Sequence, residues 1–163
     1  MIYYKSRYIS DALGIKLAKW KRWAREFLPP DPLSGQQSGY ARNFNIKDAF
    51  HVYLAGHLVG TMSFSIAQAR QIMSDLGPSL KQRGYHVLHA NGLSDAQKFF
   101  WVLIHQRPDG SFAYVESPET DSAQTMALAS QSLSEFLSTS GFLDARIISI
   151  SALYRYFFYR INP

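Results

Sequence analysis

The side chains best suited to binding an anion gather in residues 16–26, where cations alternate with apolar and aromatic residues. Leu17, Trp20 and Ala24 recur at helical spacing, so one side of a helix formed here can pack while other sides carry charge. The cations are Lys16, Lys19, Lys21, Arg22 and Arg25. Trp20 is expected in the core, whereas Trp23 fits the core and a DNA contact about equally. Such a helix predicts a surface that binds phosphates and base edges.

The positive charge of the chain belongs to its first half. The 163 residues carry a formal net charge of +5 and an isoelectric point near 9.5. Residues 1–80 contain ten basic and five acidic side chains, whereas residues 81–163 contain seven of each. Counterion release from a nucleic acid would therefore be driven by the first half of the chain.

The segments around the basic run have the order of a helix-turn-helix. Ser6 can cap a first helix, and Gly14 can end it in a left-handed conformation. The basic helix then begins near Lys16 and stops before Pro29, because proline disfavours helical geometry in the residue before it. A charged run alone is more often a solvated surface, but this order of elements favours DNA recognition.

Turn-forming residues fill positions 31–39 and lead to a short extended run over residues 40–44, which we interpret as a hairpin wing. Asn45 can cap a third helix from residue 46 to about residue 58. A fourth helix is expected to start at Ser63 or Ser65. Gly77 and Pro78 are expected to end it, because proline lacks the backbone donor that a helix needs.

Together these segments resemble the DNA-binding domain of the MerR family of transcriptional regulators, over roughly the first 77 residues. The matching pieces are Leu13-Gly14-Ile15, Lys21-Arg22-Trp23, Phe27-Leu28-Pro29-Pro30, Ser38-Gly39-Tyr40-Ala41-Arg42, Asn45-Ile46-Lys47-Asp48, and Gly60 with Phe64-Ser65. The resemblance implies that the second helix, with the five cations named above, and the wing, with Tyr40 and Arg42, contact double-stranded DNA. It also implies a dimer on paired half-sites that bends its target.

The second half reads as a small α+β domain. Residues 98–105 and 111–115 are aromatic and β-branched runs around the turn Pro108-Asp109-Gly110, which predicts a β-hairpin. A helix over about residues 121–137, a strand over 145–150 and a last helix over 151–161 are expected to follow. The predicted organisation is therefore a mainly α winged helix-turn-helix domain (1–77), a linker (78–97) and an α+β domain (98–163).

Several classes of function are not expected. The chain has no cysteine, and so neither a disulfide nor a thiolate metal site. His51 and His57 do not share a helix face, and His86 and His89 lack a third ligand, so a metal site is not predicted. Enzyme motifs are missing, and we expect no catalytic residues and no cofactor. No apolar run is long enough to span a membrane, and a cytoplasmic protein is expected.

The sequence thus predicts a cytoplasmic transcriptional regulator that binds duplex DNA and dimerises through its C-terminal domain, or senses a small-molecule effector with it. The aromatic content of that domain exceeds what so small a core needs, which favours contact with a second copy of the chain or with an apolar ligand. Two alternatives remain: an architectural or excisionase-like DNA binder that senses nothing, and a module whose basic helix contacts an acidic protein.

Overall fold

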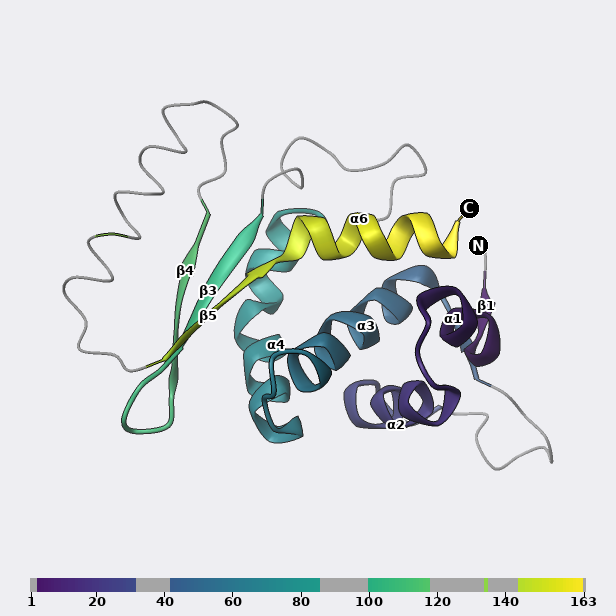
Figure 1. The fold of residues 1–163 in the computed structure, drawn as a ribbon, viewed down its shortest axis with the longest axis horizontal. Helices are drawn as coiled ribbons and strands as arrows, with labels where there is room; N and C mark the ends of the chain where they lie inside the picture. Colours follow the sequence, from purple (N-terminus) through teal and green to yellow (C-terminus); the bar gives the residue numbers. More distant parts are fainter. Residues whose placement is uncertain (1–2, 32–41, 86–99, 118–133, 135–143, 163) are drawn as a thin grey trace. The chain divides into compact units, whose positions relative to one another are not determined.

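The computed structural model describes residues 3–31, 42–85, 100–117, 134 and 144–162. The chain divides into two compact units, which are described separately: Met1–Leu88 together with Tyr154–Pro163, and His89–Leu153. The described residues form five α-helices and two small antiparallel sheets (Figure 1). The expected mixture of helices and small sheets is therefore confirmed at this coarse level.

The first two helices follow the limits that the sequence predicts. Helix α1 spans Ser6–Leu13, and Gly14 ends it with φ 66°, the left-handed conformation that glycine adopts at little cost. The prediction that Ser6 caps α1 is wrong, because Lys5 holds the cap position in extended backbone without a side-chain hydrogen bond. Helix α2 spans Leu17–Phe27, and Leu28 is extended before Pro29.

The strand after α2 finds its partner near the start of the chain. Strand β1 (Tyr4–Lys5) pairs antiparallel with β2 (Asn43–Phe44), with Tyr4 opposite Phe44. We expected residues 40–44 to belong to a hairpin wing. Only residues 42–44 of that run are described, and the strand they contain pairs with β1. The described end of this run therefore makes a long-range pairing, and the turn of the predicted hairpin lies outside the described residues.

Helix α3 spans Ile46–Gly60 and begins as predicted, since the Asn45 side chain accepts a hydrogen bond from the backbone N–H of Asp48 at 2.7 Å. Helix α4 spans Ile66–Gln82 and begins with a capping box. The Ser65 hydroxyl accepts from the N–H of Gln68, and the Gln68 side chain accepts from the N–H of Ser65. Of the two predicted starts, Ser65 is the one used.

The predicted end of the fourth helix is wrong, because α4 continues through Pro78 to Gln82. A proline inside a helix costs about 3 kcal/mol through its missing donor and its clash with the preceding turn. Pro78 and Ser74, one turn before it, are both exposed, so the helix can open toward solvent there. Tyr85, just beyond the helix, is 4% exposed and stacks on Phe50, and this burial offsets the cost. The predicted linker therefore begins inside a helix.

The end of the chain completes the first unit. Helix α6 spans Ile150–Ile161, and its residues from Tyr154 onward belong to this unit. The ring of Tyr154 meets Phe50 edge-on at 4.9 Å between centroids, and Phe157 packs on the same ring at 5.4 Å. The hydroxyl of Tyr8 donates to the carbonyl of Ile161 at 2.9 Å. A helix predicted to belong wholly to the second domain thus contributes to the core of the first unit.

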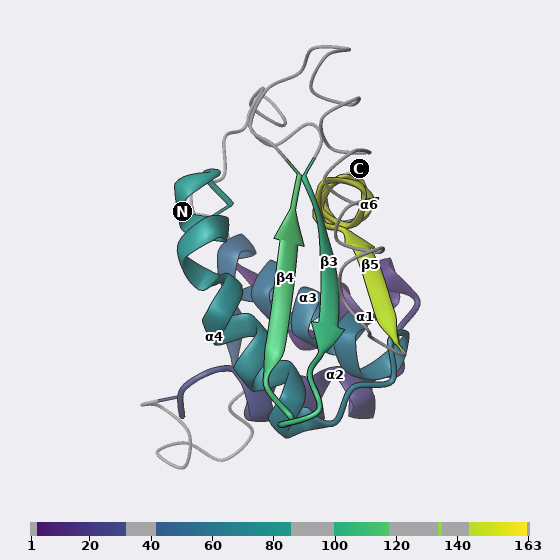
Figure 2. The ribbon, with the colours of Figure 1, turned by 90° about the vertical axis from the view of Figure 1, so that its left-hand side faces the viewer.

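The second unit contains the predicted hairpin. Strands β3 (Trp101–Gln106) and β4 (Phe112–Glu116) pair antiparallel around a turn in which Gly110 has φ 86°. Strand β5 (Ala145–Ser149) pairs antiparallel with the other edge of β3, which gives the order β4-β3-β5 (Figure 2). The predicted hairpin and third strand are confirmed, while the helix predicted over residues 121–137 lies almost entirely outside the described residues.

Candidate nucleic-acid interface

The inner face of α2 fixes the helix firmly against the rest of its unit. Trp20 is fully buried and meets Phe44 of β2 edge-on at 5.6 Å between ring centroids, while Trp23 is 6% exposed. Trp23 covers Gly56 of α3 so closely that a Cβ built on Gly56 would lie 2.2 Å from the indole atom Cε3. Trp20 is in the core, as expected. Trp23, for which the sequence left a core position and a DNA contact equally open, is also in the core.

The outer face of α2 carries cations and one small residue. Lys21, Arg22 and Arg25 are exposed, and so is Ala18, which lies between them on the helical wheel. At 100° per residue these four positions fall within about 100° of one another, opposite the two tryptophans. Ala18 leaves space at the N-terminal end of this basic face, so the helix backbone can approach a partner closely there.

The remaining predicted cations of α2 lie beside the basic face. Lys16 is the exposed cap residue of the helix. The ammonium group of Lys19 lies 4.9 Å from the ring centroid of Trp23, an arrangement that restricts the lysine by a cation–π contact. The structure thus brings together all five predicted cations of the helix, three on its outer face and two along its edge and start.

A groove adjoins the basic face where α2, the end of α3 and the start of α4 meet. We call it the α2 groove. Its volume is about 720 Å³, and it is lined by Ala18, Lys19, Arg22, Trp23, Val59, Gly60, Phe64, Ser65 and Ile66. Its floor is mostly apolar, and its cations come from α2. The first turn of α4 opens beside it, and a helix start carries partial positive charge. Its capping box already binds the N–H groups of Ser65 and Gln68.

The single acidic residue of α2 is neutralised by a distant cation. Arg70 of α4 places its Nη2 atom 2.6 Å from the Glu26 carboxylate, and its Nε atom donates to the Glu26 carbonyl at 3.0 Å. The second bond also satisfies one of the carbonyls left without a partner at the end of a helix. The basic face of α2 therefore keeps its positive charge without an opposing free carboxylate from its own helix.

The two residues expected in the wing differ in what the structure says of them. Arg42 donates from Nη1 to the carbonyl of Pro29 at 2.9 Å, and its guanidinium lies 5.7 Å from the Phe44 ring centroid. This places Arg42 beside the chain that leaves α2, where it holds that chain in position. Tyr40 lies outside the described residues.

Sequence reasoning missed three members of this surface. Ala18 could have been found from its helical spacing to Lys21 and Arg25, since all three recur on one face. Arg70 gives no local signal, because 44 positions separate it from Glu26. The contribution of Ser65 and the start of α4 to the groove depends on how α4 packs beside α2, which no periodicity predicts.

No cluster of three histidine or acidic side chains that could hold a metal ion occurs in the described part of the chain. Burial lowers the pKa of both His51 and His57 from its usual value, so both rings are mainly neutral at neutral pH. None of the described helices combines the length and apolar character needed to cross a membrane.

No protein-family model matches the chain, and a search of curated proteins finds no match either.

Proposed function

We propose that the protein reads duplex DNA by placing the basic face of α2 in a major groove, as a transcriptional regulator of MerR-like type. The observation that carries the proposal is the division of α2 into two faces. One face is anchored by two buried tryptophans, and the other presents Lys21, Arg22 and Arg25 to solvent around Ala18.

The dimensions of the helix suit this role. The 11 residues of α2 extend over about 16 Å at the usual rise of a helix. A major groove about 12 Å wide admits one α-helix and exposes a distinct pattern of donors and acceptors at each base pair. Arginine and lysine on the inserted face can donate to guanine or to phosphate, and Lys16 and Lys19 along the edge are in position for the flanking backbone.

The α2 groove supports a phosphate contact next to the inserted helix. Lys19 and Arg22 line it from α2, and the start of α4, where the helix dipole is positive, adds Ser65 and Ile66. Backbone contacts of this kind fix the register of a helix on the duplex without reading sequence. The proposal therefore assigns base reading to the outer face of α2 and positioning to the groove.

The dimer and the effector belong to the same proposal. The resemblance to MerR regulators implies two copies on paired half-sites, with the second unit as the dimerisation or sensing part. A size-exclusion mass near twice 18.5 kDa at micromolar concentration is the expected result. A mass of one chain would remove the dimer from the proposal while leaving DNA binding by α2 untouched.

Retention of genomic duplex fragments at two salt concentrations tests the proposal. We expect a few fragments to be retained selectively, with an affinity that falls steeply as salt rises. Replacing Arg22 by Ala should weaken binding by about 1–3 kcal/mol if the side chain contacts a base. The matched control is Arg155→Ala, which removes an exposed arginine from α6 and should leave binding unchanged.

Two outcomes would contradict the proposal. Retention of all fragments alike would indicate an architectural binder that does not read sequence. Failure to bind duplex DNA at low salt, with a native melting curve, would leave the basic face as a surface for an acidic protein.

A further inference from the structure

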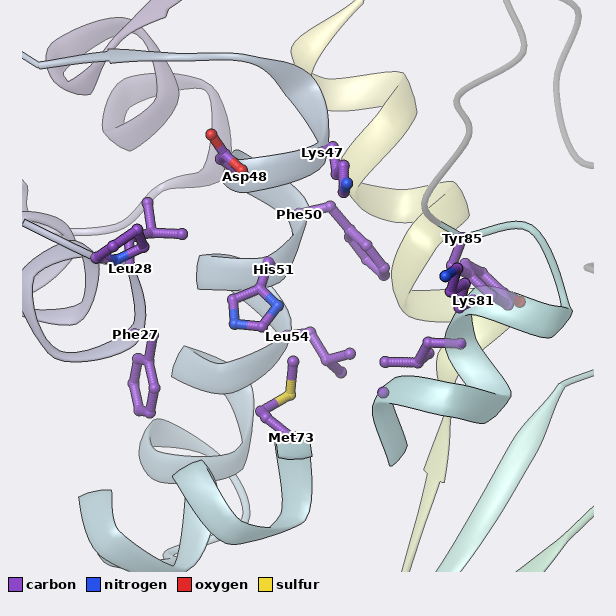
Figure 3. Close-up of a pocket in the computed structure, with 13 residues that line it drawn as sticks. Phe27, Leu28, Lys47, Asp48, Phe50, His51, Leu54, Met73, Lys81 and Tyr85 are labelled. Carbon is purple, nitrogen blue, oxygen red and sulfur yellow. The ribbon is translucent and has the colours of Figure 1, made fainter. Parts of the chain in front are cut away.

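A second hollow lies in the first unit, at the opposite end of α4 from the α2 groove. We call it the His51 pocket. Its volume is about 600 Å³, within the range of sites that bind small molecules. Its walls come from the end of α2, from one side of α3, from the last turns of α4 and from Tyr85 (Figure 3). Three helices therefore contribute to one open hollow.

The inner wall of the pocket is apolar and well fixed. Phe50, Leu54 and Met73 are 3%, 1% and 5% exposed, so each is held by the core behind it. Tyr85 stacks on Phe50 with 6.1 Å between ring centroids, which fixes the wall at the far end of α4. These side chains form a fixed floor, and the apolar surface that a ligand can reach belongs to the half-buried Phe27, Leu28 and Leu80. Such a surface suits an apolar or aromatic body and offers it few polar partners.

The rim carries two cations from different helices. Lys47 lies in the first turn of α3, and Lys81 lies in the last turn of α4; both are exposed. Neither makes an ion pair with any described residue. Lys47 is also placed unfavourably, because the start of a helix carries partial positive charge. An anion bound at this rim would relieve that repulsion.

The carboxylate of Asp48 offsets one of the two lysine charges and the histidine adds none, so the rim keeps a net positive charge. The Asp48 carboxylate accepts a hydrogen bond at 2.9 Å from the Asn45 side chain, as part of the cap of α3. Burial lowers the pKa of His51, so its ring is mainly neutral at neutral pH. The pocket therefore combines an apolar wall, a neutral imidazole, and two lysines against one carboxylate, whose orientation is fixed by the helix cap.

We propose that the His51 pocket binds a small amphipathic carboxylate, with its apolar body against Phe27, Leu28 and Leu80 and its carboxylate at Lys47 and Lys81. The proposal does not depend on DNA binding. Phe27 and Leu28 line the same pocket, so a bound acid would also contact the end of the helix that carries the basic face.

Matched probes test the class of ligand. 1-Naphthaleneacetate supplies an aromatic body with a carboxylate, and 1-naphthaleneacetamide keeps the body without the charge. Titration calorimetry on the full chain at neutral pH should show the acid binding about tenfold more tightly than the amide, the ratio that corresponds to about 1.4 kcal/mol. The double variant Lys47→Gln with Lys81→Gln should lose this preference and keep a native melting curve, since both side chains are exposed.

A second variant tests the location. Gly77 lines the pocket, and a Cβ built on it meets no atom within 4 Å, so Gly77→Leu can add a side chain without a clash at its first carbon. This variant should weaken binding of the acid and the amide alike. The proposed site would be overturned if the acid bound to Gly77→Leu and to the double lysine variant as tightly as to the parent chain.

Two further results would overturn the proposed ligand class. Equal affinity for acid and amide would show a pocket that recognises only the apolar body. No binding of either probe at about 1 mM, with the protein folded, would show that the pocket takes no ligand of this kind.

Discussion

The α2 groove and the His51 pocket lie at opposite ends of α4 and differ little in size, at about 720 and 600 Å³. Their chemistry differs more. In the α2 groove the cations continue onto the open outer face of α2. In the His51 pocket two lysines stand at the rim of an apolar wall, together with one carboxylate. The two hollows therefore cannot be distinguished by their volumes.

This difference indicates two kinds of partner. Charge that extends along a helix beyond its groove suits a polyanion larger than the groove itself, such as a duplex. Charge at the rim of an apolar hollow suits a molecule small enough to enter. Helix α2 contributes to both hollows, with Arg22 in the first and Phe27 in the second, so changes in its position should affect both.

The largest expected effect comes from the contact that sets the position of α2. Gly56→Ala places a methyl group where the Trp23 ring lies, with 2.2 Å between the new carbon and Cε3. Neither α3 nor the buried indole can yield easily, so we expect a loss of roughly 1–3 kcal/mol in the free energy of unfolding. Denaturant unfolding monitored by tryptophan fluorescence measures it.

The matched control is Gly77→Ala, where the new methyl group meets nothing within 4 Å. Alanine is the better helix former by about 1 kcal/mol, but residue 77 precedes Pro78, which disfavours helical geometry in a residue that has a Cβ. Because these two effects oppose each other, Gly77→Ala should change the free energy of unfolding much less than Gly56→Ala. A larger loss at Gly77 than at Gly56 would contradict the packing described for α2 and α3.

The next effect concerns the basic face alone. Ala18→Glu adds a carboxylate among Lys21, Arg22 and Arg25 without removing any cation. If the new carboxylate cancels one phosphate contact, the slope of log affinity against log salt concentration should become shallower by about 0.9. Ala152→Glu, at an exposed position of α6, is the control and should bind DNA like the parent chain. An unchanged salt dependence in Ala18→Glu would remove the outer face of α2 from the interface.

A smaller effect on stability is expected from a change in pH. Burial lowers the pKa of His51 and His57 in the folded protein below the unfolded value of about 6.5. Over that interval the unfolded state binds more protons, so stability should fall as pH drops from about 6.5 through the lowered folded values, and level off below them. Melting temperatures across this range measure the effect. His51→Gln with His57→Gln should reduce the slope, and an unchanged slope would assign it to other groups.

The smallest effect is expected at the pair formed by Arg70 and Glu26. Both side chains are partly exposed, so Arg70→Ala should cost no more than about 1 kcal/mol in stability. The same change leaves the Glu26 carboxylate unpaired near the basic face, and DNA affinity should fall slightly. Glu26→Gln removes that charge and should raise affinity at low salt. A loss of affinity in Glu26→Gln would contradict this account.

The sequence determined the elements whose signals lie within a few residues. Gly14 ended α1, Asn45 and Ser65 capped α3 and α4, and the turn at Pro108-Asp109-Gly110 joined two strands. These predictions succeeded because a cap or a tight turn depends on the conformations that neighbouring residues can adopt and on hydrogen bonds between them. The cations of α2 and the burial of Trp20 followed from helical periodicity in the same way.

Tertiary structure decided where distant segments meet. It paired β2 with β1, carried α4 through Pro78, gave the end of α6 to the first unit and brought Arg70 to Glu26. It also formed both hollows from three or more segments each. The physical reason is that the cost of a proline in a helix, or the choice of a strand partner, is balanced against apolar surface buried by residues far away in the chain, and that burial has no local signature.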